Sequence, residues 1–125
     1  MSKGFEIEFR NDHVHIQLEP EYEFDPAGSE EIWARLKELC REHATSRVFV
    51  EGFVPPGERK TEEVVAAGER TAAVPRLWLA FHLENFVRSE QSELFEVIAA
   101  SRGVRVKFFA DREHALMWLR NNAPS

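Results

Sequence analysis

Two short segments that are apolar on both of their alternating faces most constrain how this chain can fold. The first, Arg47–Glu51, reads RVFVE, and the second, Leu77–Leu83, reads LWLAFHL. A strand with one buried face alternates between apolar and polar residues, whereas a strand covered on both faces is apolar almost throughout. We therefore predict that both segments are interior strands of a parallel or mixed sheet.

The amino-terminal residues have a different pattern, in which apolar and polar side chains alternate. Phe5–Arg10 and Val14–Leu18 each follow this period of two, and the turn signal Asn11-Asp12 lies between them. This pattern is typical of an antiparallel hairpin with one face of each strand in solvent. We expect the hairpin at an edge of the sheet, with His13 and His15 on an exposed face.

Helical periodicity and capping residues occupy the intervals between the strands. The expected helices are one from Pro26 to near Ala44 with Asp25 as N-cap, one from about Glu62 to Ala73 with Thr61 as N-cap, one capped by Ser89 and ended by Gly103, and one capped by Asp111. A last strand, Val104–Phe109, separates the final two helices.

The order of elements is therefore β-β-α-β-α-β-α-β-α. A helix between two strands of one sheet implies a parallel crossover, so three crossovers follow the leading hairpin. The predicted fold class is α/β, a mixed β-sheet with an N-terminal antiparallel hairpin and helices packed against it. No repeat or linker interrupts residues 1–125, and we expect a single domain.

Composition argues against several classes of partner and compartment. The formal net charge is −6, and acidic and basic residues are interspersed without a basic stripe, so neither nucleic acid nor an anionic membrane is expected as a partner. Cys40 is the only cysteine, which excludes an internal disulfide framework and fits a reducing compartment. No secretory signal and no apolar run of about 20 residues is visible, so we expect a cytoplasmic protein.

Two stretches make the chain resemble a known family. They read RVFVEGF at Arg47–Phe53 and GVRVKFFADREHALMWLR at Gly103–Arg120. Together with the order of elements, they resemble the STAS superfamily, and within it the SpoIIAA-like group related to anti-sigma-factor antagonists. The resemblance implies a small mixed-sheet domain that works by binding, usually without catalysis.

The motif that carries regulation in that group is missing from this chain. Regulatory members have Asp-Ser-Ser-Gly after the strand that corresponds to Arg47–Glu51, with a serine phosphorylated at a helix amino end. The corresponding positions here read Arg59-Lys60-Thr61-Glu62, without a serine. A phosphate on Thr61 would be stabilised by the helix amino end but repelled by Glu62 and Glu63. We interpret Thr61 as a helix cap, with a phosphoacceptor as the alternative.

The predicted binding surface lies at the carboxyl ends of the interior strands, where loops commonly bind partners. Its residues are Phe53, Val54, Pro55, Pro56, Arg59, Lys60, Thr61 and Phe86. Two prolines stiffen the first loop, so binding would cost little ordering entropy, and apolar residues beside basic ones are typical of interface hot spots. Glu84–Arg88 and Phe109–Arg112 are expected nearby. In the alternative interpretation, both phenylalanines are core residues and the charges are solvated.

Candidate catalytic and metal-binding residues are present but incomplete. His13 and His15 have a spacing that could bind a metal with Asp12, yet no further ligand is evident, so we expect no metal and no cofactor. His82 and Glu84 end an interior strand, where an acid–base pair is conceivable. Because no nucleophile or phosphate-binding motif accompanies them, we expect no enzyme.

The aromatic residues leave a second function open, a carrier of a small apolar ligand. They have core spacing but could line a cavity: Trp33, Trp78, Trp118, Phe81, Phe95 and Phe108. The second helix has few apolar residues and contains Gly68, so a groove beneath it is the expected place. Cys40 is interpreted as a core residue. The preferred function is a regulatory or protein-interaction domain with an unidentified protein partner, and a homodimer is left open.

Overall fold

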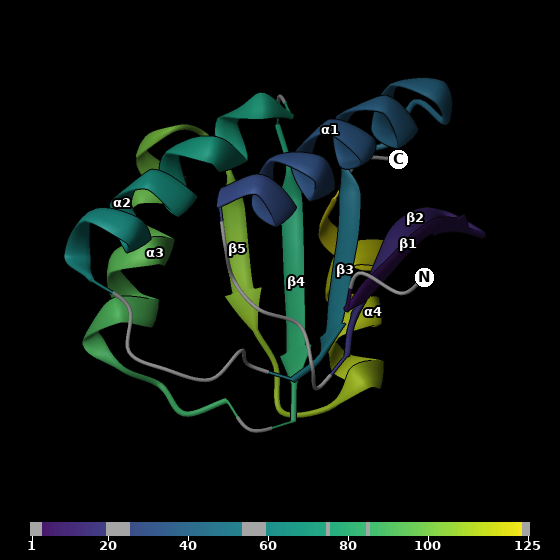
Figure 1. Cartoon of the computed structure of the whole chain (residues 1–125). Helices are drawn as coiled ribbons and strands as arrows, with labels where there is room; N and C mark the ends of the chain where they lie inside the picture. Colours follow the sequence, from purple (N-terminus) through teal and green to yellow (C-terminus); the bar gives the residue numbers. More distant parts are fainter. Residues whose placement is uncertain (1–3, 20–25, 54–59, 75, 85, 124–125) are drawn as a thin grey trace.

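One mixed sheet with helices on both faces organises the protein (Figure 1). A computed structural model describes residues 4–19, 26–53, 60–74, 76–84 and 86–123. In these ranges the strands are β1 (Phe5–Arg10), β2 (His13–Leu18), β3 (Arg47–Gly52), β4 (Trp78–Leu83) and β5 (Arg105–Phe108). The helices are α1 (Pro26–Glu42), α2 (Thr61–Arg70) with a 3-10 turn at Thr71–Ala73, α3 (Glu90–Ser101) and α4 (Arg112–Asn122). The predicted order of elements is confirmed.

The strands lie in the order β1-β2-β3-β4-β5. β1 pairs with β2 in antiparallel orientation, and the pairs β2–β3, β3–β4 and β4–β5 are parallel. The predicted hairpin and three parallel crossovers are therefore confirmed. β3 and β4 each have a neighbour on both sides, as their two-sided apolar sequences predict.

Alternate residues of β3 and β4 enter two separate cores. Val48 and Val50 of β3, together with Leu79 of β4, lie in one core with side chains of α1 and α3. Phe49 and Ala80 face the opposite side, where α4 covers them. In Figure 1, α4 accordingly lies behind the sheet, α1 crosses in front of it, and α2 and α3 lie together beside β5. Because both faces are buried, a polar residue within either strand would need a partner.

Two glycines allow close approaches that no other residue would permit. Gly52 ends β3 with φ of +132°, and a Cβ there would lie 2.0 Å from the carbonyl oxygen of Leu18. Gly68 brings α2 against α3, because a Cβ there would lie 2.6 Å from Cγ2 of Ile98. Gly68, where the sequence suggested a groove beneath the second helix, is therefore a site of close packing between α2 and α3.

The helix limits agree with the sequence except near their ends. Ser89 and Asp111 cap α3 and α4, since their side chains accept from the backbone N–H of Ser92 at 3.2 Å and of His114 at 2.9 Å. The predicted cap at Thr61 is wrong by one residue, because Lys60 is the N-cap of α2 and Thr61 is its first helical residue.

The remaining differences are small. α1 ends at Glu42 rather than near Ala44, and the second predicted helix divides into α2 and the 3-10 turn. β4 begins one residue later than predicted, and β5 is shorter at both ends. Asp25, the predicted cap of α1, lies outside the described residues. No helix within the described ranges is long and apolar enough to cross a membrane.

The prediction that His13 and His15 occupy an exposed strand face is wrong. Their exposed fractions are only 7 % and 3 %. β2 is not an edge strand, since β1 lies on one side and β3 on the other, and both imidazoles pack near the ring of Phe49, at centroid distances of 6.2 and 5.7 Å. Only β1 of the hairpin forms the sheet edge.

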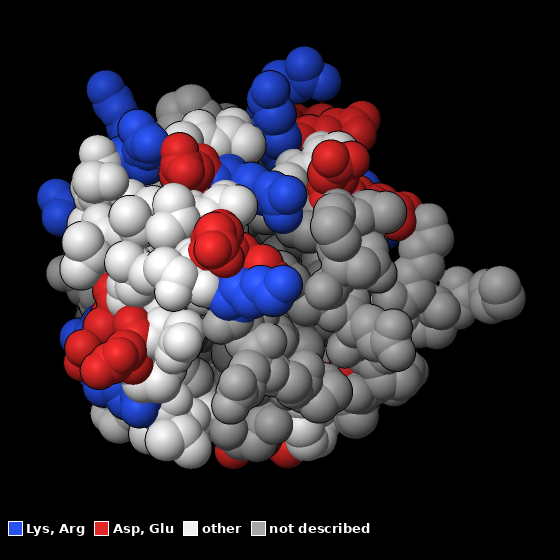
Figure 2. Space-filling view, turned by 60° about the vertical axis from the view of Figure 1, so that its left-hand side comes forward, with Lys and Arg blue, Asp and Glu red and all other residues white. Residues whose placement is uncertain are grey.

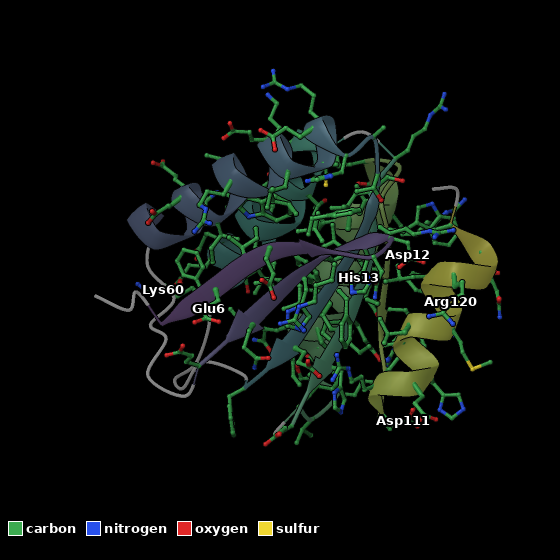
Figure 3. The ribbon with its side chains drawn as sticks, turned by 90° about the vertical axis from the view of Figure 1, so that its right-hand side faces the viewer. Glu6, Asp12, His13, Lys60, Asp111 and Arg120 are labelled. Atoms are coloured by element: carbon green, nitrogen blue, oxygen red, sulfur yellow. The ribbon has the colours of Figure 1, made fainter. Side chains whose placement is uncertain are left out.

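Arg47 joins the tip of the hairpin to the end of α4. Its guanidinium donates to Asp12 in the β1–β2 turn at 3.0 Å and to the carbonyl oxygen of Ala123 at 2.8 Å. Figure 3 shows Asp12 at the hairpin tip beside Arg120 of α4, and the Arg120 guanidinium lies 4.0 Å from the same carboxylate. The hydrogen bond from His13, together with the charges of His13, Arg47 and Arg120, outweighs burial and lowers the pKa of Asp12.

Candidate functional site

The loops at the carboxyl ends of the parallel strands meet at one edge of the sheet, as predicted. We call the described residues of this region the carboxyl-end surface: Phe53, Lys60, Thr61, Glu84, Phe86–Arg88 and Phe109–Arg112. Lys60, Thr61 and Glu84 are exposed, and Phe53 is half-buried. The predicted binding residues Val54, Pro55, Pro56 and Arg59 lie outside the described residues.

Phe86 is part of an aromatic stack rather than a free apolar side chain. Its ring lies parallel to that of Phe108 with a centroid distance of 4.3 Å, and Phe108 in turn stacks on Phe81 at 4.8 Å. Phe86 therefore shields the edge of the core while keeping part of its surface exposed. The neighbouring Val87 is 80 % exposed and was not singled out from the sequence. It is the more accessible apolar side chain of this loop.

Below the loops, on the α4 side of the sheet, a polar cluster forms around Glu51. Nε2 of His15 lies 3.0 Å from Oε1 of Glu51, within hydrogen-bond distance. Nδ1 of His82 lies 3.5 Å from Oε2, and the guanidinium of Arg112 lies 3.9 Å from the same oxygen. The four residues come from β2, β3, β4 and the start of α4, so folding alone brings them together.

The cluster keeps Glu51 ionised although its side chain is only 16 % exposed. Burial by itself would raise the pKa of Glu51, but the hydrogen bond with His15, the charge of Arg112 and the contact with His82 outweigh it and lower that pKa. Burial lowers the pKa of His15, which is therefore biased towards the neutral imidazole. A neutral His15 donating from Nε2 to an ionised Glu51 is the arrangement that follows.

The structure places His82 beside Glu51, and not beside Glu84, the acid that the sequence offered as a conceivable partner. Glu84 follows the end of β4 and is exposed. Nδ1 of His82 is buried and has no hydrogen bond among the described residues. The sequence analysis did not identify Glu51 as a site residue. A single acid in an interior apolar strand was a usable signal, because a buried charge requires partners.

Other candidate residues do not assemble into a reactive site. Cys40 is 5 % exposed in the core beneath α1, where burial raises the pKa of its thiol to about 11. It lies on the opposite side of the sheet from His82, so these two residues do not form a Cys–His pair. Within the described ranges, no three His, Cys, Asp or Glu residues are arranged to hold a metal ion.

Comparison with known proteins identifies the fold. The chain matches no family model and no curated protein sequence. Its structure is similar to a solved structure of the anti-sigma factor antagonist SpoIIAA in its unphosphorylated form, with 16 % sequence identity and a TM-score of 0.54. The similarity covers 96 % of this chain and 99 % of that chain. The protein therefore has the STAS/SpoIIAA-like fold that the sequence resemblance implied.

Proposed function

We propose that this chain is a non-catalytic regulatory domain that binds a partner protein through the carboxyl-end surface. The observation that carries the proposal is the similarity to SpoIIAA over nearly the whole of both chains, because that protein is an anti-sigma factor antagonist. Since similar folds carry unrelated functions, the surface itself has to supply the second argument.

The carboxyl-end surface has features that suit protein binding. Val87 offers an exposed apolar side chain, and Lys60 and Thr61 present exposed polar groups at the start of α2. The Glu51 cluster below is held by contacts between separate strands, which provides a rigid base. A rigid base lowers the entropy that is lost on binding. Val54, Pro55, Pro56 and Arg59 belong to the proposed surface on the sequence argument alone.

The surface charge favours a protein over a nucleic acid. On the face displayed in Figure 2, acidic and basic side chains of the described residues are interspersed, without a continuous basic area. Nucleic-acid binding relies on such basic areas. The cytoplasm stays the proposed compartment because the sole cysteine fits reducing conditions. Self-association into a homodimer stays open to measurement.

We also propose that the phosphorylation switch of the regulatory relatives is missing. Thr61 is the first residue of α2 and is exposed, but Glu62 and Glu63 follow it in the same turn, where they would repel a phosphate. After incubation with a serine/threonine kinase and ATP, intact mass spectrometry should show no stoichiometric phosphate. Stoichiometric phosphorylation that disappears in Thr61→Val would contradict this proposal.

The small-ligand carrier is the weaker candidate. It required a groove beneath α2, and the contact between Gly68 and Ile98 brings α2 directly onto α3 at that point. No described contact favours an apolar ligand there, so we do not develop this function.

Two exposed valines provide a matched test of the proposed surface. Val87 is 80 % exposed on the carboxyl-end surface, and Val97 is 63 % exposed within α3, outside that surface. Tagged wild-type protein is used to capture a partner from a lysate of the source cells, and binding of the purified partner is then measured by calorimetry. Val87→Glu should weaken binding by about tenfold or more, as expected for an apolar interface residue. Val97→Glu should leave it unchanged. Equal affinities for both variants would contradict the placement.

A further inference from the structure

The free edge of β1 borders a groove that the proposed function does not use. The groove has a volume of about 500 Å³ and lies between β1 and α1. Its lining combines three apolar side chains with five polar or charged ones: Ile7, Phe9 and Leu39 with Glu8, Arg35, Glu38, Glu42 and His43. Figure 3 shows α1 running along the hairpin. The volume is within the range of about 300–1,000 Å³ found for ligand sites.

The backbone of β1 directs hydrogen-bonding groups into this groove. In an antiparallel pair, alternate residues bond to the partner strand and the others point away from it. The carbonyl oxygen of Gly4 accepts from the N–H of Glu19 at 2.8 Å, which places Glu6, Glu8 and Arg10 in the set that bonds to β2. The backbone N–H and C=O groups of Ile7 and Phe9 therefore point away from β2, and the carbonyl oxygen of Ile7 accepts from Nη2 of Arg35 in α1 at 3.4 Å.

The helix side of the groove carries two glutamates, Glu38 and Glu42, beside Arg35 and His43. Glu38 and Glu42 are four residues apart, so they lie on one face of α1 and repel each other. Neither has an ion-pair partner among the described residues, whereas Glu8 of β1 is held by Arg10. Both glutamates are exposed. A cation placed between them would relieve the repulsion.

We propose that this β1–α1 groove binds an extended peptide segment of a partner protein by strand addition, with Lys or Arg at alternate positions. The segment would pair with the outward backbone groups of Ile7 and Phe9, as peptides do when they extend a sheet edge, and its N–H would replace Arg35 at the carbonyl oxygen of Ile7. Every second side chain of an added strand faces α1. A lysine there packs its methylene stem on Ile7, Phe9 and Leu39 and brings its ammonium group to Glu38 and Glu42. The site is separate from the carboxyl-end surface, so each proposal can fail without the other.

A capped hexapeptide that alternates Lys and Val tests the proposal on the full chain. Nuclear magnetic resonance titration should shift the amide signals of Ile7 and Phe9, and their hydrogen exchange should slow in the complex. The amides of Glu6 and Glu8, already bonded to β2, should keep their exchange rates. The same peptide with N-methyl groups on alternate amides should bind at least about tenfold more weakly, because it cannot pair with the strand.

Charge reversal provides the second arm. The double variant E38K/E42K should weaken the Lys-Val peptide by about tenfold, as expected from two lost ion pairs, and should favour the corresponding Glu-Val peptide. The matched control E90K/E113K changes net charge equally and should bind like wild type. Equal binding by the two double variants, equal binding of the N-methylated peptide, or shifts confined to the carboxyl-end surface would overturn the proposal. Self-association that protects Ile7 and Phe9 would overturn it as well, since a second copy would then be the occupant.

Discussion

Replacing Gly68 by alanine sets helix propensity against packing, and the structure decides which effect is larger. In an exposed helix, Gly→Ala adds about 1 kcal/mol of stability. At Gly68 the new methyl carbon would lie 2.6 Å from Cγ2 and 2.7 Å from Cβ of Ile98. A β-branched side chain in a helix has one preferred rotamer, so Ile98 of α3 cannot easily turn away. Overpacking of this kind costs about 1–3 kcal/mol. We expect Gly68→Ala to lower the free energy of unfolding by about 1 kcal/mol in total.

Urea unfolding of four proteins measures this balance: wild type, Gly68→Ala, Ile98→Gly and the double variant. Ile98→Gly removes both Cγ2 and Cβ of residue 98, so the clash is gone and Gly68→Ala should become stabilising by about 1 kcal/mol. The coupling between the two sites should be about 1–3 kcal/mol. Ala67→Gly, the control for helix propensity alone, should cost about 1 kcal/mol. If Gly68→Ala stabilises the wild-type background, the close contact of α2 with α3 is wrong and the apolar-ligand function regains support.

Three further predictions concern Arg47, His15 and Trp118. Arg47→Lys should cost about 1–3 kcal/mol in urea unfolding, because an ammonium group cannot bond both the hairpin turn and the α4 carbonyls; a negligible change would contradict that role. Burial lowers the pKa of His15 in the folded protein. The stability that the neutral imidazole contributes is therefore present above the unfolded pKa of about 6.5 and is lost as pH falls through that value towards the folded pKa. The Tm of the wild type should fall as the pH is lowered through this range, and His15→Gln should remove this part of the pH dependence. The same dependence of Tm on pH in both proteins would refute the assignment. Trp118 is half-buried, with its ring 5.2 Å from that of Trp78, so Trp118→Ala should fall at or below the low end of about 3–5 kcal/mol; a surface-like cost under about 0.5 kcal/mol would show that the ring does not pack.

The elements that depend on local pattern were predictable from the sequence. The two-sided apolarity of Arg47–Glu51 and Leu77–Leu83 placed both strands inside the sheet, and the caps at Ser89 and Asp111 were correct. Periodicity and capping act within a few residues, so one sequence contains them. The cap at Thr61 was displaced by one position because its neighbours Glu62 and Glu63 fit either start of the helix.

The exposure of the histidines and the Glu51 cluster depended on which strands become neighbours. His15 and Glu51 are 36 positions apart, and their contact exists only because β2 pairs with β3. The alternating pattern of β2 fits an exposed face equally well, so the pattern alone placed His13 and His15 wrongly. Because His15 is buried against Glu51, His15→Ala should cost about 1–3 kcal/mol, since a partly buried carboxylate oxygen would lose its partner. The proposed binding residues of the first loop stay predictions.

The central claim is that a partner protein binds at the carboxyl ends of the parallel strands. A hydrogen-exchange footprint of the full chain, with and without the purified partner, tests it most directly. The account predicts slower exchange in the segments at Gly52–Thr61, Glu84–Arg88 and Phe109–Arg112, with the same segments unprotected when Val87→Glu replaces wild type. A footprint confined to the hairpin Phe5–Leu18, with those segments unchanged, would contradict it.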